Sequence, residues 1–147
     1  ITGSSTVQYP TTTTTYTVTG TNAAGCTGTQ TITVTVYPNP VVTATANPAS
    51  ICIGSSTTIT ATGATNYIWL NNNKTSASIT VSPTVTTTYT VSGTNSSTGC
   101  TSTASVTVIV NPLPTITTTA SATTVCSGSP VTITASGGVS YRFFSYC

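Results

Sequence analysis

The chain has 147 residues, and only Lys74 and Arg142 carry a charged side chain, which gives a formal net charge of +2. Asp, Glu and His are absent, whereas Thr makes up more than a quarter of the residues. General acid–base catalysis needs His, a carboxylate or a tuned Lys, and calcium and zinc sites need carboxylates, His or close Cys pairs. The composition therefore argues against an enzyme and against a metal or cofactor site. Two positive charges also give no basic surface for nucleic acid.

The uncharged residues point to a folded β protein. Val, Ile and Tyr alternate with Thr and Ser along much of the chain, and these residue types suit a half-buried pleated sheet. Disordered chains combine low hydrophobicity with high net charge, and this chain has neither. No apolar run approaches the roughly 20 residues that a membrane-spanning helix needs. We therefore expect an all-β protein without a membrane span. No signal peptide is visible, which indicates a mature segment or a piece of a longer chain.

Three stretches of the sequence occur twice. Their first members are TTTYTVTGTN (13–22), GCTGTQTITVTVYPNP (25–40) and ICIGSSTTITATGATNYIW (51–69). Their second members are TTTYTVSGTN (86–95), GCTSTASVTVIVNPLP (99–114) and VCSGSPVTITASGGVSYRF (125–143). The offset is 73 residues between Tyr16 and Tyr89 and 74 between Cys26 and Cys100. Because a fixed period marks repeated structural units, we expect domains of about 74 residues.

Residues 1–38 are expected to hold the later strands of one such domain. Its core residues in this part of the chain are Tyr16, Val18, Ile32, Val34 and Val36. The sequence YPNP (37–40) follows as a joint, and NPLP (111–114) forms a second joint after the next copy. Proline cannot donate a hydrogen bond to a neighbouring strand and keeps a linker extended, so both joints are expected to act as semi-rigid spacers.

Residues 39–112 are expected to form a complete domain. Short alternating or apolar segments predict strands at 41–46, 57–63, 67–70, 78–82, 88–95 and 105–110. Six or seven short strands at a spacing of roughly 8–12 residues indicate a β-sandwich. Trp69 on the third strand and Tyr89 near the start of a later strand stand where Ig-type sandwiches have a core aromatic and a tyrosine corner.

Residues 113–147 are expected to hold the first strands of a further copy. Its apolar residues include Ile133, Tyr141 and Phe143. If Ile1 of another unit follows directly after Cys147, Pro10 falls fourteen residues after Phe143, as Pro83 falls fourteen residues after Trp69. We therefore expect residues 113–147 of one unit to pack with residues 1–38 of the next. The units are either one continuous chain or subunits that complete each other as donor-strand pilins do.

The stretches TTTYTVSGTNSSTGC, SVTVIVNPLP, ICIGSSTTITATG and YIW resemble Ig-like tandem repeats of large secreted surface proteins from Bacteroidota-type bacteria. The resemblance covers essentially the whole chain. It implies an extracellular array of Ig-like sandwiches in an adhesin or a cell-surface filament, and it implies nothing about a ligand. The chain departs from such repeats because it lacks Asp and Glu.

The cysteines permit two disulfide arrangements in an oxidising extracellular setting. The favoured arrangement joins Cys52 to Cys100, and Cys126 to Cys26 of the following copy, because one bond within each small domain would supplement its small core. The alternative bonds, Cys26–Cys52 and Cys100–Cys126, would join neighbouring domains across the proline joints, and free buried thiols are a third possibility. Cys147 has no counterpart in the other copy, so it is expected to be free or to bridge to a neighbouring chain.

Asn73 and Asn95 begin matches to the N-glycosylation sequon, and the many hydroxyl groups could accept O-linked glycans. The simpler reading of the Thr residues is that they fill the solvent face of strands while keeping β propensity. Glycans are therefore candidate partners beside neighbouring units of the same protein.

Two functions fit these features. The first is a secreted structural repeat of an extracellular filament or surface stalk, which near-zero net charge favours because it promotes self-association. The alternative is an adhesive module that binds carbohydrate or a host surface. For that function the only candidate contact groups are the NNNK loop (71–74) and Tyr9.

Overall fold

The computed structural model describes residues 3–145, which contain eleven β-strands and no helix. The strands are β1 (Thr14–Thr21), β2 (Thr27–Val34), β3 (Thr43–Asn47), β4 (Ser50–Cys52), β5 (Thr57–Thr62), β6 (Asn66–Trp69), β7 (Ser78–Val81), β8 (Thr87–Thr94), β9 (Thr101–Asn111), β10 (Thr117–Ala120) and β11 (Ile133–Ser136). The prediction of an all-β protein is confirmed. Its cause is the long alternation of β-branched and aromatic residues with Thr and Ser.

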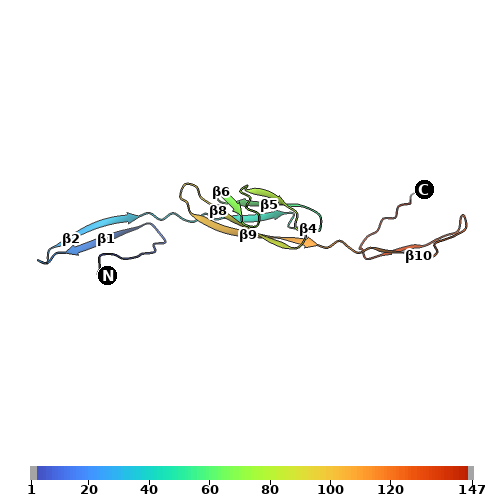
Figure 1. The fold of residues 1–147 in the computed structure, drawn as a ribbon, viewed down its shortest axis with the longest axis horizontal. Helices are drawn as coiled ribbons and strands as arrows, with labels where there is room; N and C mark the ends of the chain where they lie inside the picture. Colours follow the sequence, from blue (N-terminus) through green and yellow to red (C-terminus); the bar gives the residue numbers. More distant parts are fainter. Residues whose placement is uncertain (1–2, 146–147) are drawn as a thin grey trace.

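The strands form three parts that lie in line (Figure 1). At one end β1 pairs with β2, and at the other end β10 pairs with β11, both antiparallel. Between them lie a three-stranded sheet in the order β3-β5-β7 and a four-stranded sheet in the order β4-β9-β8-β6. The chain between the parts passes through residues 35–42 and 112–116, which are not in strands and include the two proline joints.

The apolar core of the described residues lies between the two central sheets. Along β5 and β8 buried residues alternate with more accessible ones, as expected for strands with one face on a core. The largest fully buried side chains are Trp69, Ile59, Val91 and Val108. Burying a side chain of this kind stabilises the fold by about 1.5–3 kcal/mol, so this cluster is the main source of stability of the central part.

The turn between β5 and β6 fixes how the chain leaves one sheet for the other. Gly63 has a φ of +93°, and a Cβ atom added there would lie 1.8 Å from the carbonyl oxygen of Val41. Only glycine fits a position that combines a left-handed backbone with so close an approach of the segment before β3. The Tyr67 hydroxyl closes the same turn, because it accepts a hydrogen bond from the Ala64 N–H (2.9 Å) and donates one to the Ala64 carbonyl (2.8 Å).

Hydroxyl groups on the outer faces pair across neighbouring strands. The pairs, separated by 2.6–3.1 Å, are Thr15–Thr33, Thr43–Thr62, Thr60–Ser78, Thr88–Thr107, Thr90–Ser105 and Thr117–Ser136. Cross-strand hydroxyl pairs stabilise a sheet modestly and need no charge. They give the Thr-rich composition a structural role on the solvent-facing side.

Two features of the central part differ from the prediction. The last strand begins at Thr101 rather than at residue 105, so β9 has 11 residues. The short strand β4 was not predicted, and it pairs in parallel with β9, with Cys52 opposite Asn111. Three residues between a proline turn and Gly54 are too few to show an alternating pattern, which is why the sequence gives no signal for β4.

Candidate assembly surfaces

The β1–β2 hairpin repeats the pairing of β8 with β9. Tyr16 lies opposite Ile32 as Tyr89 lies opposite Val106. The outward hydroxyl pairs Thr15–Thr33 and Thr88–Thr107 occupy corresponding places, each at 2.8 Å. The two hairpins therefore have the same register at the sequence offsets of 73 and 74.

The pair β10–β11 repeats the pairing of β3 with β5. Ala120 lies opposite Ile133 as Ala46 lies opposite Ile59. The turn after β11 is also the same, because Gly137 has a φ of +92° close to that of Gly63. The Tyr141 hydroxyl exchanges hydrogen bonds of 2.7 Å with the N–H and carbonyl of Gly138, the arrangement that Tyr67 makes with Ala64.

The corresponding side chains differ in exposure. Val18 is 63% exposed, whereas Val91 at the same place in β8 is 0% exposed. Ile133 is 47% exposed, whereas Ile59 at the same place in β5 is 0% exposed. Both terminal pairs thus present, without a covering sheet, the face that the central part uses for its core.

The four aromatic residues expected in cores divide in the same way. Trp69 and Tyr89 are buried in the central part, and the Trp69 indole N–H donates a hydrogen bond of 3.0 Å to the Ser76 carbonyl. Phe143 is 60% exposed and Tyr16 is half-buried. By sequence offset the four residues are equivalent in pairs, but only the central pair lies under a second sheet.

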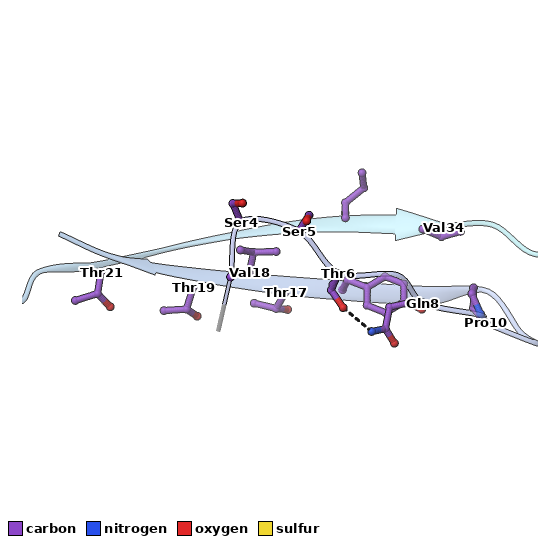
Figure 2. Close-up of a pocket in the computed structure, with 13 residues that line it drawn as sticks. Ser4, Ser5, Thr6, Gln8, Pro10, Thr17, Val18, Thr19, Thr21 and Val34 are labelled. Atoms are coloured by element: carbon purple, nitrogen blue, oxygen red, sulfur yellow. Dashed lines mark hydrogen bonds between the residues drawn. The ribbon is translucent and has the colours of Figure 1, made fainter. Parts of the chain in front are cut away.

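A groove of about 1110 Å³ lies along the apolar side of β1 and β2. The hairpin contributes Tyr16, Val18, Ile32 and Val34 to its lining, and the segment from Gly3 to Pro10 contributes small and polar residues. In Figure 2 Ser4, Ser5 and Thr6 lie on a segment that crosses beside the hairpin, and Val34 lies at the end of β2. Residues 3–10 contain no strand, whereas residues 76–83, their counterparts at the offset of 73, contain β7.

The structure contradicts the expected bond between Cys52 and Cys100. Cys52 lies opposite Asn111 at the end of β9, whereas Cys100 directly precedes Thr101 at its start. Eleven strand residues span about 35 Å, but a disulfide needs two Cα atoms within about 7 Å. The sequence places Cys52 before the second predicted strand and Cys100 before the last one, without showing that these positions lie at opposite ends of the central part. Cys26, Cys52, Cys100 and Cys126 are free thiols, and all but the half-buried Cys100 are exposed. Cys147 lies outside the described residues.

The two candidate glycosylation residues occupy turns. Asn73 is exposed, has a φ of 55°, and its N–H donates a hydrogen bond of 2.8 Å to the Trp69 carbonyl. Asn95 is half-buried, and its Oδ1 accepts a hydrogen bond of 3.0 Å from the Ser97 N–H. The left-handed backbone of Asn73 and the Asx turn at Asn95 give both residues a structural reason in these turns.

The electrostatics of the chain are unusually simple. Burial raises the pKa of the Tyr89 hydroxyl above its ordinary value of 10.0, because the phenolate would be poorly solvated there. In residues 3–145 no three metal-binding side chains come together. These surfaces can therefore interact through apolar packing and through hydrogen bonds between hydroxyl groups.

Over the described part of the chain, no helix is long and apolar enough to cross a membrane. Comparison with models of known protein families and with curated protein sequences gives no match.

Proposed function

We propose that the chain is a structural repeat of an extracellular filament or surface stalk, built as a head-to-tail array of Ig-like domains. The observation that carries the proposal is the exposure of apolar residues on β1, β2 and β11 at positions whose counterparts lie in or against the central core. An uncovered apolar face with open strand edges favours association. The pairing of the two sheets in the central part indicates which strands should cover this apolar face.

The same pairing specifies the contact between two units. In the central part β6 pairs with β8, and Trp69 lies opposite Val91. The same register places Phe143 of one unit opposite Val18 of the next, beside the groove on the β1–β2 hairpin. Residues 113–145 then supply the counterparts of β3, β5 and β6, while residues 3–38 of the next unit supply those of β8 and β9.

The two terminal pairs are at opposite ends of the molecule, with both central sheets between them (Figure 1). We therefore expect them to meet between units rather than within one. The contact joins two different surfaces, so each unit keeps one free surface for a further neighbour. Such a heterologous contact propagates into a linear assembly when it does not close on itself. The domains in this proposal are residues 39–112 and the domain formed by 113–147 with 1–38 of the next unit.

Two further features support the proposal. The net charge of +2 on 147 residues gives little electrostatic repulsion between units. The resemblance of the repeats to Ig-like domains of secreted bacterial surface proteins supports an extracellular location.

The test is assembly of the purified 147-residue chain, followed by sedimentation and electron microscopy. We expect unbranched fibres whose axial repeat is two domain lengths. Val18→Asp should raise the concentration needed for assembly by about 100-fold or more, because it would bury an unpaired carboxylate against Phe143. Thr31→Asp adds the same charge to the outer face of the hairpin and should assemble like the unchanged chain.

The fluorescence of Trp69, the only tryptophan, reports whether the central part of each variant stays folded. Dispersed unchanged chains at high concentration, or equal assembly of the two variants, would overturn the proposal.

A further inference from the structure

We infer that a disulfide crosses each joint of the array. Cys52 of one unit bonds to Cys26 of the next, and Cys126 of one unit bonds to Cys100 of the next. This inference rests on the proposed head-to-tail array and assigns the four described cysteines to contacts between its units. The bonds form between two units, because the strands hold the paired cysteines far apart within one chain.

Cys100 marks the end of the central part that faces the β1–β2 hairpin. Its Sγ lies 3.8 Å from the carbonyl oxygen of Tyr37, the first residue of the YPNP joint. The thiol is half-buried against this joint, although the two residues are 63 positions apart in the sequence.

Cys52 marks the other end of the central part. It lies opposite Asn111, the last residue of β9, and the N–H of the following residue, Ile53, donates a hydrogen bond of 2.9 Å to the Asn111 carbonyl. Asn111 is the first residue of the NPLP joint. The exposed Cys52 thiol therefore lies beside the joint that leads to β10.

Tyr37 and Asn111 are equivalent positions, 74 residues apart. In a domain completed by two units, Cys126 of the first unit therefore lies beside Tyr37 of the second, as Cys52 lies beside Asn111. The Cys100 thiol of that second unit already lies 3.8 Å from the Tyr37 carbonyl oxygen. Both thiols of the pair are thus placed at one peptide group of the joint.

The same reasoning applies to the other joint. Cys26 is equivalent to Cys100, at the start of β2, and in a completed domain its thiol lies at the Asn111 carbonyl of the preceding unit. Cys52 of that preceding unit is the strand neighbour of Asn111. One pair of cysteines therefore meets at each joint.

Within a single chain these pairs are far apart. Cys26 lies at the turn between β1 and β2, and β2, the YPNP joint and the central sheets separate it from Cys52 (Figure 1). Cys126 lies between β10 and β11, beyond the second joint, while Cys100 lies at the first joint. The bonds therefore require a second unit.

The chemistry is thiol–disulfide exchange. Two thiols lose two protons and two electrons to a low-molecular-weight disulfide, one S–S bond forms between the cysteines, and the small disulfide is reduced to two thiols. The exposure of Cys26, Cys52 and Cys126 gives such an oxidant access before or during assembly.

The sequence provides a direct assay, because trypsin can cleave only after Lys74 and Arg142. Residues 1–74 then contain Cys26 and Cys52, and residues 75–142 contain Cys100 and Cys126. The inferred bonds join like fragments from different chains, whereas a Cys52–Cys100 bond would join unlike fragments. The chain is assembled with oxidised glutathione in a Cys147→Ser background, then alkylated, denatured and digested without reductant.

We expect two separate ladders, one of linked 1–74 fragments and one of linked 75–142 fragments. In a mixture of normal and 15N-labelled chains, mass spectrometry should find bonds between light and heavy fragments. Cys26→Ser should remove the ladder of 1–74 fragments and leave the ladder of 75–142 fragments intact. The second ladder is then the internal control for assembly and oxidation.

Fibres that form under reducing conditions but give neither ladder after oxidation would overturn this inference and leave the proposed function standing. Bonds between 1–74 and 75–142, or bonds found only within one chain, would also overturn it. Failure to form fibres with or without reductant would overturn both.

Discussion

Nearly all residues of this protein are uncharged, so its polar interactions are hydrogen bonds between neutral groups. Threonine combines a β-branched shape with a hydroxyl group, so it favours the strand and also pairs across the sheet, as Thr88 and Thr107 do. Polar groups of the core have partners as well: the Thr57 hydroxyl donates a hydrogen bond of 2.6 Å to the Pro48 carbonyl. Within the described residues no buried side-chain nitrogen or oxygen lacks a hydrogen-bond partner.

Tyr89 should make stability fall at alkaline pH. Its pKa is raised by burial in the folded state, so its contribution is fully present below about pH 10, the pKa of an unfolded Tyr, and is lost as pH rises through the folded value. We expect the free energy of unfolding to fall as pH rises above about 10, and to fall less in Tyr89→Phe. Urea unfolding with alkylated thiols, followed by Trp69 fluorescence, measures both slopes. Equal slopes would show that Tyr89 does not carry the effect.

The turn between β5 and β6 is the element on which the position of β6 depends. Gly63→Ala should destabilise the central part by about 2–4 kcal/mol, because it adds a clash with the Val41 carbonyl to the strain of a left-handed residue. Gly54→Ala is the matched control, since Gly54 has a φ of +88° but open space where a Cβ would lie. Strain alone should cost about 1–2 kcal/mol there. The comparison is by urea unfolding, and similar losses in both variants would contradict the role of the close approach.

At the scale of elements, the period-2 pattern located most strands well. β5 was expected at 57–63 and β8 at 88–95, and each lies within one residue of its prediction. Alternation reveals such strands because one face is buried and the other meets solvent. β4 has only three residues, and its parallel partner β9 is far away in the sequence, so no local pattern identifies it.

The candidate surfaces were predictable only in part. Repetition in the sequence aligned Val18 with Val91 and Phe143 with Trp69, which identified the residues of the exposed faces. The favoured disulfide was wrong because spacing does not show at which end of the central part each cysteine lies. That information depends on the direction of β9 and on the contact between Cys100 and Tyr37, both of which are three-dimensional.

As a whole molecule, the protein should resist acid. Acid unfolding arises mainly from carboxylates that must be protonated and from buried His that must become charged, and the sequence has no Asp, Glu or His. We expect the free energy of unfolding to change by less than about 0.5 kcal/mol between pH 2 and pH 6, because the chain has no Asp, Glu or His to titrate in this range. Urea titrations read by Trp69 fluorescence across this range are the measurement. A loss of more than about 1 kcal/mol at pH 2 would contradict it.

The parallel pairing of β4 with β9 determines how the central part bears tension. A pull along the long axis enters the central part at the start of β3, beside the YPNP joint, and the chain carries it through β3 to β4. The pull leaves through the last residues of β9, which pair with β4. Because β4 and β9 run in the same direction, these forces slide the two strands past each other. The bonds from Ile109 N–H to Ala49 and from Ile53 N–H to Asn111, both 2.9 Å, are therefore loaded together in shear, where an antiparallel pair pulled at one end would unzip bond by bond.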